Sequence, residues 1–264
     1  FSNPSSLRLY SHFGTQVKEL SIGGNVKKIG DGAFRNNDSL ATVNIYADID
    51  TIGGNAFYDC SKITSISLPN SLKYIGDYAF SGTGLTSVVI PENVVIGSSP
   101  FGSCDSLKAI TLKSSSIANT EWGIKNAFGG KNLKTIILAD NITRIGQYAF
   151  SGLVNLEQIL LSENIDTIGN NAFSECVSLS SITLPSSVTC IGGRAFEGCT
   201  GLSSITIPSS VTNIASTAFS GCNSLTNVTI NSNSFISKDF SKSEFSEQSC
   251  LKYIFGTQVK EYTI

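Results

Sequence analysis

The stretch IGGRAFEGCTGLSSITIPSSV, residues 191–211, determines the fold, because most of the chain repeats it. An Ala-Phe pair stands at the centre of each unit, with Pro100-Phe101 in place of one pair, and successive phenylalanines are 21 to 27 residues apart. A period of about 20 to 50 residues is typical of solenoids, whose units bury their apolar side chains only by stacking on neighbours. We therefore expect the repeated phenylalanines to stack in a buried row. The eight pairs are Ala33-Phe34, Ala56-Phe57, Ala79-Phe80, Ala127-Phe128, Ala149-Phe150, Ala172-Phe173, Ala195-Phe196 and Ala218-Phe219.

Each repeat contains two apolar segments that differ in spacing. In the first, Leu202, Ile205 and Ile207 follow the pattern L-x-x-I-x-I, and the last two alternate as in a strand with one buried face. Pro208 follows directly and ends the strand, because proline cannot donate to a ladder. In the second segment, two apolar residues three apart precede a glycine. This spacing predicts a short extended segment, a tight glycine turn, and one helical or 3₁₀ turn that carries Ala-Phe.

The complete repeat pattern, LxxIxIPxxVxxIGxxAFxxCxxL, resembles the leucine-rich repeats of BspA-like, Treponema-type surface proteins over residues 22–230. The resemblance implies a leucine-rich repeat solenoid: a right-handed curved coil, mainly β, with a parallel sheet on the concave face and short 3₁₀ or helical turns. It also implies an extracellular or cell-surface protein, typically of host-associated bacteria, that acts in adhesion and binding. It implies no particular ligand.

The first unit of the chain and the residues after 230 depart from the repeat, and the expected domain organisation follows from them. Residues 1–230 are predicted to form the solenoid, with about nine coils of ~23 residues and an atypical N-terminal unit. Residues 231–264 are predicted to form an atypical C-terminal capping or junction unit. The motif FGTQVKE at 13–19 reappears at 255–261, which is 242 residues later and too far for one coil. We therefore expect a second, larger repeat, and a chain that is a monomeric segment of a longer array.

Composition excludes several classes of function. Charged residues make up 14% of the chain and the formal net charge is -2, so no basic surface is expected for nucleic acid. No apolar run approaches the roughly 18 residues that membrane insertion needs. His12 is the one histidine, and it lies in the irregular N-terminal segment without a fixed acid or cysteine nearby. The Ile-Gly turns lack the spacing of phosphate-binding loops. We expect no catalytic residue, no metal and no cofactor.

The chain has seven cysteines, and five of them share one position, three residues after the repeat phenylalanine. In the other repeats this position holds Asn37, Thr83, Lys131 and Leu153, so it does not require sulfur chemistry. Parallel Cβ directions in stacked coils do not fit disulfide geometry. Buried free thiols are the preferred interpretation, and some disulfide bonds or a metal site are the alternatives. The five are Cys60, Cys104, Cys176, Cys199 and Cys222.

The strand residues that alternate away from the core form an outward column, and this column supplies the candidate site. Most of its members are polar, but the central coils carry Val89, Ile137 and Leu160, next to an enlarged coil that contains Trp122. An exposed apolar patch beside an aromatic residue is typical of a contact site. We predict ligand-binding residues on the concave face, namely Val89, Thr111, Trp122, Ile137 and Leu160. The alternative is that β-propensity alone accounts for these residues and that the inserted loop covers them.

Two functions follow from these observations. The first is a non-enzymatic, adhesin-like binding module, secreted or at the cell surface, that recognises a host protein or glycan through the concave face. The second is a passive structural spacer within a longer repeat array, which the repeated FGTQVKE motif favours.

Overall fold

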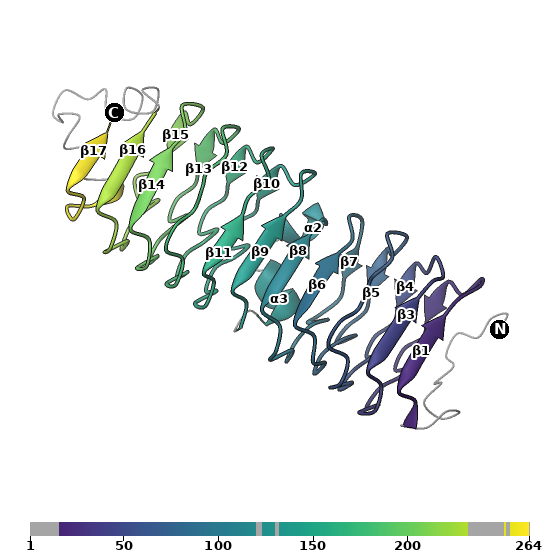
Figure 1. Ribbon diagram of the computed structural model, residues 1–264. Coiled ribbons are helices and arrows are strands. Elements are labelled where there is room, and N and C mark those ends of the chain that lie inside the picture. The colour runs from purple at the N-terminus through teal and green to yellow at the C-terminus, as the bar shows by residue number, and fades with distance from the viewer. Residues whose placement is uncertain (1–15, 120–122, 130–131, 232–250, 252–253, 264) are drawn as a thin grey trace. The chain divides into compact units, whose positions relative to one another are not determined.

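A computed structural model of the protein describes residues 16–119, 123–129, 132–231, 251 and 254–263. The chain divides into two compact units. Unit 1 consists of Phe1–Ile117 and Asn126–Leu133, and unit 2 consists of Ala118–Lys125 and Lys134–Ile264. Each unit is a stack of coils in which all the paired strands run parallel (Figure 1). The predicted mainly β, parallel solenoid is therefore confirmed.

The longer strands come from the L-x-x-I-x-I segments. In unit 1 two strand pairs form, β1 (Glu19–Ile22) with β3 (Thr42–Ile45) and β6 (Ser87–Ile90) with β8 (Ala109–Leu112). In unit 2 the pairings are β9 (Thr135–Leu138) with β11 (Gln158–Leu160), and β16 (Asn227–Ile230) with both β14 (Ser204–Ile207) and β17 (Glu261–Thr263). Pro91 and Pro208 directly follow β6 and β14, where the sequence predicted that the ladder ends.

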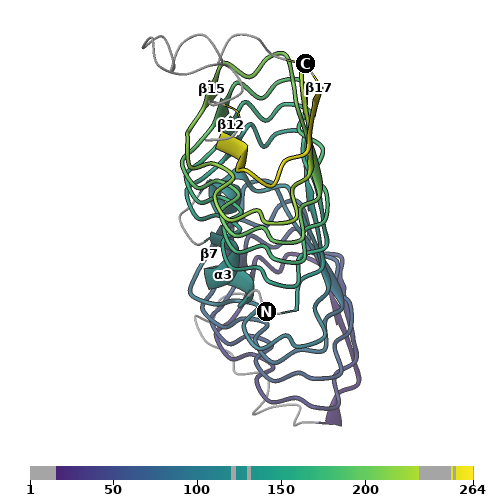
Figure 2. The same cartoon turned by 90° about the vertical axis from the view of Figure 1, so that its left-hand side faces the viewer.

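A second row of two-residue strands comes from the segment that precedes the glycine. Figure 2 shows these short strands on the side of the coils opposite the long ones. Unit 1 contains β2 (Lys28–Ile29), β4 (Thr51–Ile52), β5 (Tyr74–Ile75) and β7 (Val95–Ile96), hydrogen-bonded in that order. Unit 2 contains β10 (Arg144–Ile145), β12 (Thr167–Ile168), β13 (Cys190–Ile191) and β15 (Asn213–Ile214), also in that order.

The enlarged repeat contains most of the helix in the part of the chain that the structure describes. Two short helices, α2 (Ser115–Ala118) and α3 (Gly123–Phe128), occupy it, and α3 carries the pair Ala127-Phe128. The sequence predicted one helical or 3₁₀ turn here; in the regular coils the Ala-Phe pair lies in turns with hydrogen bonds between residues three apart, as from Ala195 N to Gly192 O. The amide of Phe196 donates to the carbonyl of Ala218 at 2.7 Å, so these turns bond to the next coil.

The repeated phenylalanines form the centre of the core. Ring centroids of successive coils are 4.9 to 5.4 Å apart in unit 1 and 5.0 to 5.2 Å apart in unit 2. The predicted buried row of Phe173, Phe196 and Phe219 is confirmed, and Phe255 extends it by one more ring. Pro100-Phe101 takes its place in the unit 1 row as expected. That row is Phe34, Phe57, Phe80, Phe101 and Phe128.

The glycine after the repeat isoleucine is needed because the backbone of the preceding coil passes close to it. A Cβ on Gly192 would lie 2.7 Å from the amide nitrogen of Asn170 and 2.8 Å from the carbonyl carbon of Gly169. The sequence predicted that glycine is needed here for a tight turn. The φ of Gly192 is not in the left-handed region, so the close approach of the preceding coil, and not the turn, explains the glycine. Left-handed backbone occurs instead two residues later, where Asn55, Tyr78 and Arg194 have φ between 53° and 57°.

Candidate functional site

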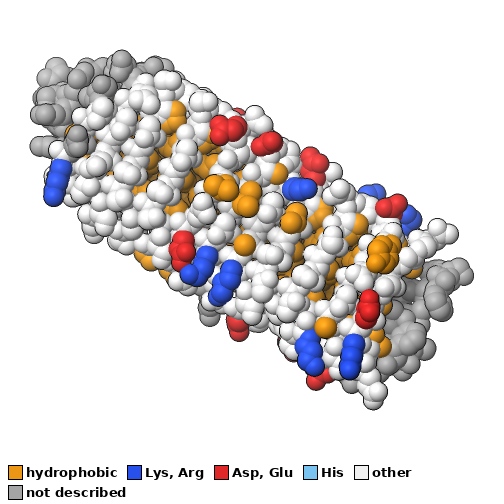
Figure 3. Space-filling view, viewed as in Figure 1, with side chains coloured by type: hydrophobic (Ala, Val, Ile, Leu, Met, Phe, Trp, Pro, Cys, Tyr) orange, Lys and Arg blue, Asp and Glu red, His pale blue; other side chains and the backbone are white. Residues whose placement is uncertain are grey.

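The outward face of the long strands is built mainly from short polar side chains. In β14 the residues Ile205 and Ile207 are buried, and Ser204 and Thr206, which alternate with them, are exposed. Figure 3 shows this side of each unit as mostly uncharged and polar, with isolated hydrophobic side chains. Such a surface has few charged groups through which it could bind a ligand. The exposed apolar residues on it are therefore the candidates for contact with a ligand.

In unit 1 the candidate residues Val89 and Thr111 are neighbours. They lie opposite each other in the register of β6 and β8, on the outward face. Val89 is 47% exposed, whereas Val88 and Ile90 on either side of it are buried. Thr111 is half-buried. The structure therefore places both residues where the alternation predicted.

In unit 2 the candidate residues Ile137 and Leu160 are also neighbours, in the register of β9 and β11. Ile137 is 37% exposed and Leu160 is 47% exposed. In the coils that follow, Thr183 and Thr206 are exposed as well, so the apolar pair is bordered by hydroxyl groups. Adjacent strands are about 4.8 Å apart, which lets one apolar group on a ligand contact both side chains. Trp122 and His12 lie outside the described residues.

Sequence reasoning missed a second group of exposed apolar side chains on the short-strand side of unit 1. Tyr74 in β5 lies opposite Val95 in β7, and they are 39% and 58% exposed. Both precede the repeat isoleucine, and the same column continues with Lys28 and Thr51. The sequence indicates this group, because the position before the repeat isoleucine changes from polar Lys28 and Thr51 to apolar Tyr74 and Val95. The sequence interpretation did not compare this position between repeats.

The five aligned cysteines are buried and free, as the preferred interpretation expected. Each thiol donates a hydrogen bond to the carbonyl of the repeat phenylalanine in the preceding coil, for example Cys199 Sγ to Phe173 O at 3.1 Å. Burial raises the pKa of Cys60, Cys176 and Cys222 to about 12. A thiol that stays protonated is a poor nucleophile and a poor metal ligand. Thr83 fills the same position with its hydroxyl donating to Phe80 O at 2.8 Å, so this position accepts a hydroxyl as well as a thiol.

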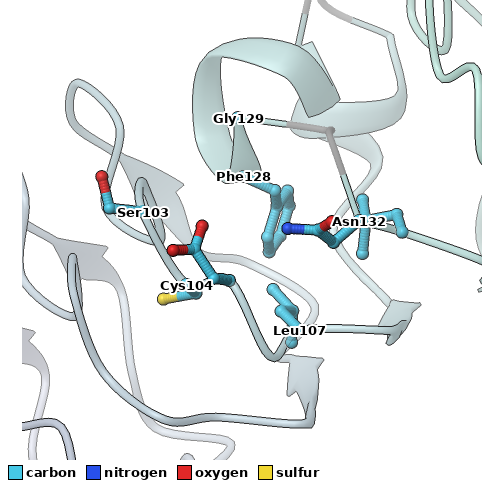
Figure 4. A pocket seen from close by; sticks show the side chains of 8 residues that line it. Ser103, Cys104, Leu107, Phe128, Gly129 and Asn132 are labelled. Carbon is cyan, nitrogen blue, oxygen red and sulfur yellow. The ribbon is translucent and has the colours of Figure 1, made fainter.

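One hollow lies among the turns of unit 1, with a volume of about 240 Å³ (Figure 4). Its walls include Leu107 and Phe128, and polar side chains in them come from Ser103, Asp105 and Asn132. The thiol of Cys104 is held by Phe80 O at 3.1 Å and has a pKa raised by burial, so it provides no reactive group. Within the ranges that the structure describes, no three His, Cys, Asp or Glu side chains are grouped so that they could hold a metal ion.

Comparison with known proteins identifies the repeat. The pattern of the BspA type leucine rich repeat region matches residues 5–121 and 124–254, in 6 copies. The chain belongs to the BspA-type leucine-rich repeat family. None of the curated proteins matches the sequence. The part of this BspA-type chain that the structure describes has no helix both long and apolar enough to span a membrane.

The BspA-type chain is also similar to solved bacterial structures. A leucine rich cell surface protein from Faecalibacterium prausnitzii A2-165 is 23% identical, with 97% of this chain and 86% of that chain covered and a TM-score of 0.41. A leucine-rich repeat protein from Bacteroides ovatus ATCC 8483 is 26% identical, with 94% and 84% covered and a TM-score of 0.42. A leucine rich repeat protein from T. pallidum is 29% identical, with 55% and 58% covered and a TM-score of 0.40.

The outward residues do not follow from the BspA-type pattern. The pattern requires apolar side chains at positions such as Ile205 and Ile207, and it leaves the residue between them free. Substitutions at that free position change the surface without changing the fold. The outward residues Val89, Ile137 and Leu160 are therefore features of this chain that the family pattern does not determine.

Proposed function

We propose that the protein is a non-enzymatic, adhesin-like binding module, secreted or at the cell surface, that recognises a host protein or glycan. Recognition would use the outward face of the long strands, which the family resemblance places on the concave side. Membership of the BspA-type family supports the surface context. The exposed pair Ile137 and Leu160 on an otherwise polar wall carries the proposal.

The energetics of this pair are adequate for a contact. Complete burial of an isoleucine or leucine side chain contributes roughly 1.5 to 3 kcal/mol, and Ile137 and Leu160 are 37% and 47% exposed. A partner that covers both would therefore gain about 2 kcal/mol, or about 30-fold in affinity. The flanking hydroxyl groups of Thr183 and Thr206 can form the polar rim that usually surrounds such anchors.

The chemistry of the described side chains supports binding over catalysis. A nucleophile needs a base within hydrogen-bond distance or a lowered pKa. The buried thiols have the opposite property, because desolvation raises the pKa of each thiol in the column. Their hydrogen bonds to backbone carbonyls stabilise the stacking of coils and leave them directed into the core.

A triple variant, Val89→Ser, Ile137→Ser and Leu160→Ser, tests the binding proposal. We expect a folded protein that loses its partner in a screen against host matrix proteins and glycans, because surface substitutions usually change stability by about 0.5 kcal/mol or less. Trp122→Ala is made separately. The matched control is Thr183→Ser with Thr206→Ser on the same face of unit 2, which keeps the hydroxyls and should bind as the parent does.

The passive spacer is the second candidate, and the repeated FGTQVKE motif favours it. The triple variant separates the two functions. A spacer has no partner to lose, so parental behaviour of both the triple variant and Trp122→Ala in every binding assay would exclude the proposed face.

A further inference from the structure

The end of the FGTQVKE motif leads into a long strand in both of its copies. β1 begins at Glu19, the last residue of the first copy, and β17 begins at Glu261, the last residue of the second copy. The next three residues also correspond, with Leu-Ser-Ile after Glu19 and Tyr-Thr-Ile after Glu261. Two segments 242 residues apart therefore form equivalent parts of a coil.

The first copy shows what packs on one side of this coil. β1 pairs with β3 in the register Glu19 to Thr42 and Ile22 to Ile45. The carbonyl of Lys18 accepts hydrogen bonds from the amides of Ala41 and Thr42, at 2.9 and 3.2 Å. At the other end of the strand, the carbonyl of Ile22 accepts from the amide of Tyr46 at 2.7 Å. The motif thus offers a defined set of acceptors to the coil that follows it.

The second copy uses its opposite side. We name residues 254–263 the terminal coil. Its strand β17 pairs with β16, Lys260 N donates to Thr226 O at 2.9 Å, and the Phe255 ring lies 5.0 Å from that of Phe219. The side chain of Gln258 donates to the carbonyl of Cys222 at 3.1 Å. All these contacts reach towards the preceding coils of unit 2.

The other side of the terminal coil has no partner among the residues that the structure describes. No described strand pairs with the second edge of β17, and no described amide donates to Lys260 O, the equivalent of Lys18 O. Tyr262 occupies the position of Leu20, and its buried hydroxyl has no hydrogen-bond partner within the described ranges. The terminal coil therefore presents a strand edge, a free carbonyl and an aromatic side chain.

We propose that this free side is a docking surface for residues 23–46 of a second copy of the chain, joined in tandem. The terminal coil, followed by Ile264, then serves that copy in the place of its residues 12–22, because the two segments share the motif and the strand position. Lys260 O receives the amides of Ala41 and Thr42 of the second copy, as Lys18 O does within one copy. The contact is head-to-tail and continues the solenoid without a break.

A direct fusion tests the proposal: residues 1–264 followed immediately by residues 23–264, so that the junction Ile264-Gly23 reproduces Ile22-Gly23. Hydrogen exchange by mass spectrometry is measured on peptides that cross the junction, because these contain residues 254–264 of the first copy only. The matched control is the same fusion with a flexible Gly-Ser linker at the junction. In the direct fusion we expect these residues to exchange about tenfold more slowly than in the single chain, because an end coil that gains a neighbour opens less often. The linker fusion should match the single chain.

Protection of residues 41–47 in the second copy gives an independent measurement. In the direct fusion the 41–47 peptide should be as protected as in the single chain, whereas in the linker fusion half of it, from the copy that lacks residues 1–22, should exchange faster. The proposal is overturned if the 254–264 peptide exchanges equally fast in the single chain and in both fusions. Both fusions contain residues 1–264, so a second copy that fails to fold also gives no added protection and counts against the proposal. Protection already present in the single chain would instead mean that another segment, such as residues 231–249, covers this side.

Discussion

The phenylalanine row makes a quantitative prediction for Phe196→Ala. The Phe196 side chain is fully buried, and its ring lies between those of Phe173 and Phe219, with centroid distances of 5.2 and 5.1 Å. Truncation of a buried phenylalanine to alanine costs about 3 to 5 kcal/mol through lost burial and the cavity that remains. Each aromatic contact adds roughly 0.5 to 1.5 kcal/mol beyond the buried area, and Phe196 has two. We therefore expect a loss of about 4 to 5 kcal/mol, in the upper part of this range.

The assay is urea unfolding followed by far-UV circular dichroism, with the free energy of unfolding taken from the midpoint and slope. Phe196→Leu is the matched control, because leucine keeps most of the volume and removes only the ring contacts. It should cost about 1 to 2 kcal/mol. A loss below about 1 kcal/mol for Phe196→Ala, or equal losses for alanine and leucine, would refute the idea that the ring packs between two neighbours in a close-packed core.

Three further predictions concern the backbone and the thiols. Gly192→Ala should destabilise the protein by about 2 kcal/mol or more in the same urea assay, because its Cβ would lie 2.8 Å from the carbonyl carbon of Gly169; an unchanged midpoint would contradict the close approach of coils. Arg194→Gly should raise stability by up to about 1 kcal/mol because φ is 57°, whereas Arg194→Ala should bring no gain. The pKa of Cys176 is raised from 9.0 to about 12 by burial, so the unfolded state loses this proton first. The contribution of this thiol to the free energy of unfolding should therefore be constant below pH 9 and decrease as the pH rises towards 12. In the variant Cys176→Ala the free energy of unfolding should decrease less over the same range.

The core of each coil could be predicted from sequence because it depends on spacing alone. The alternation of Ile205 and Ile207 determines which strand face is buried, and the period of Ala-Phe determines which rings stack. The same alternation placed Val89 and Leu160 on the outward face. Such features follow from side-chain geometry within one strand and from the identity of successive repeats.

Other features depend on contacts between coils and left no distinct signal in one repeat. The left-handed backbone position holds residues as different as Asn55, Tyr78 and Arg194, so residue type does not reveal it. The role of Gln258 was missed because it replaces a cysteine three residues after Phe255, in a segment without an Ala-Phe pair. The pairing of Tyr74 with Val95 required the register of the short strands, which the sequence interpretation did not derive.

The hydrogen bonds from the cysteines to the preceding coil have a consequence for measuring the dynamics of this protein. Cys176, Cys199 and Cys222 each donate to a carbonyl one coil earlier, so each thiol becomes accessible only when its own contact between coils opens. The natural sequence therefore contains a series of built-in reporters along unit 2, and pulsed alkylation followed by peptide mapping would give an opening rate for each position. In a linear repeat protein, rates that increase towards one end would show that unfolding starts there and travels coil by coil, whereas equal rates would show that the unit opens all at once.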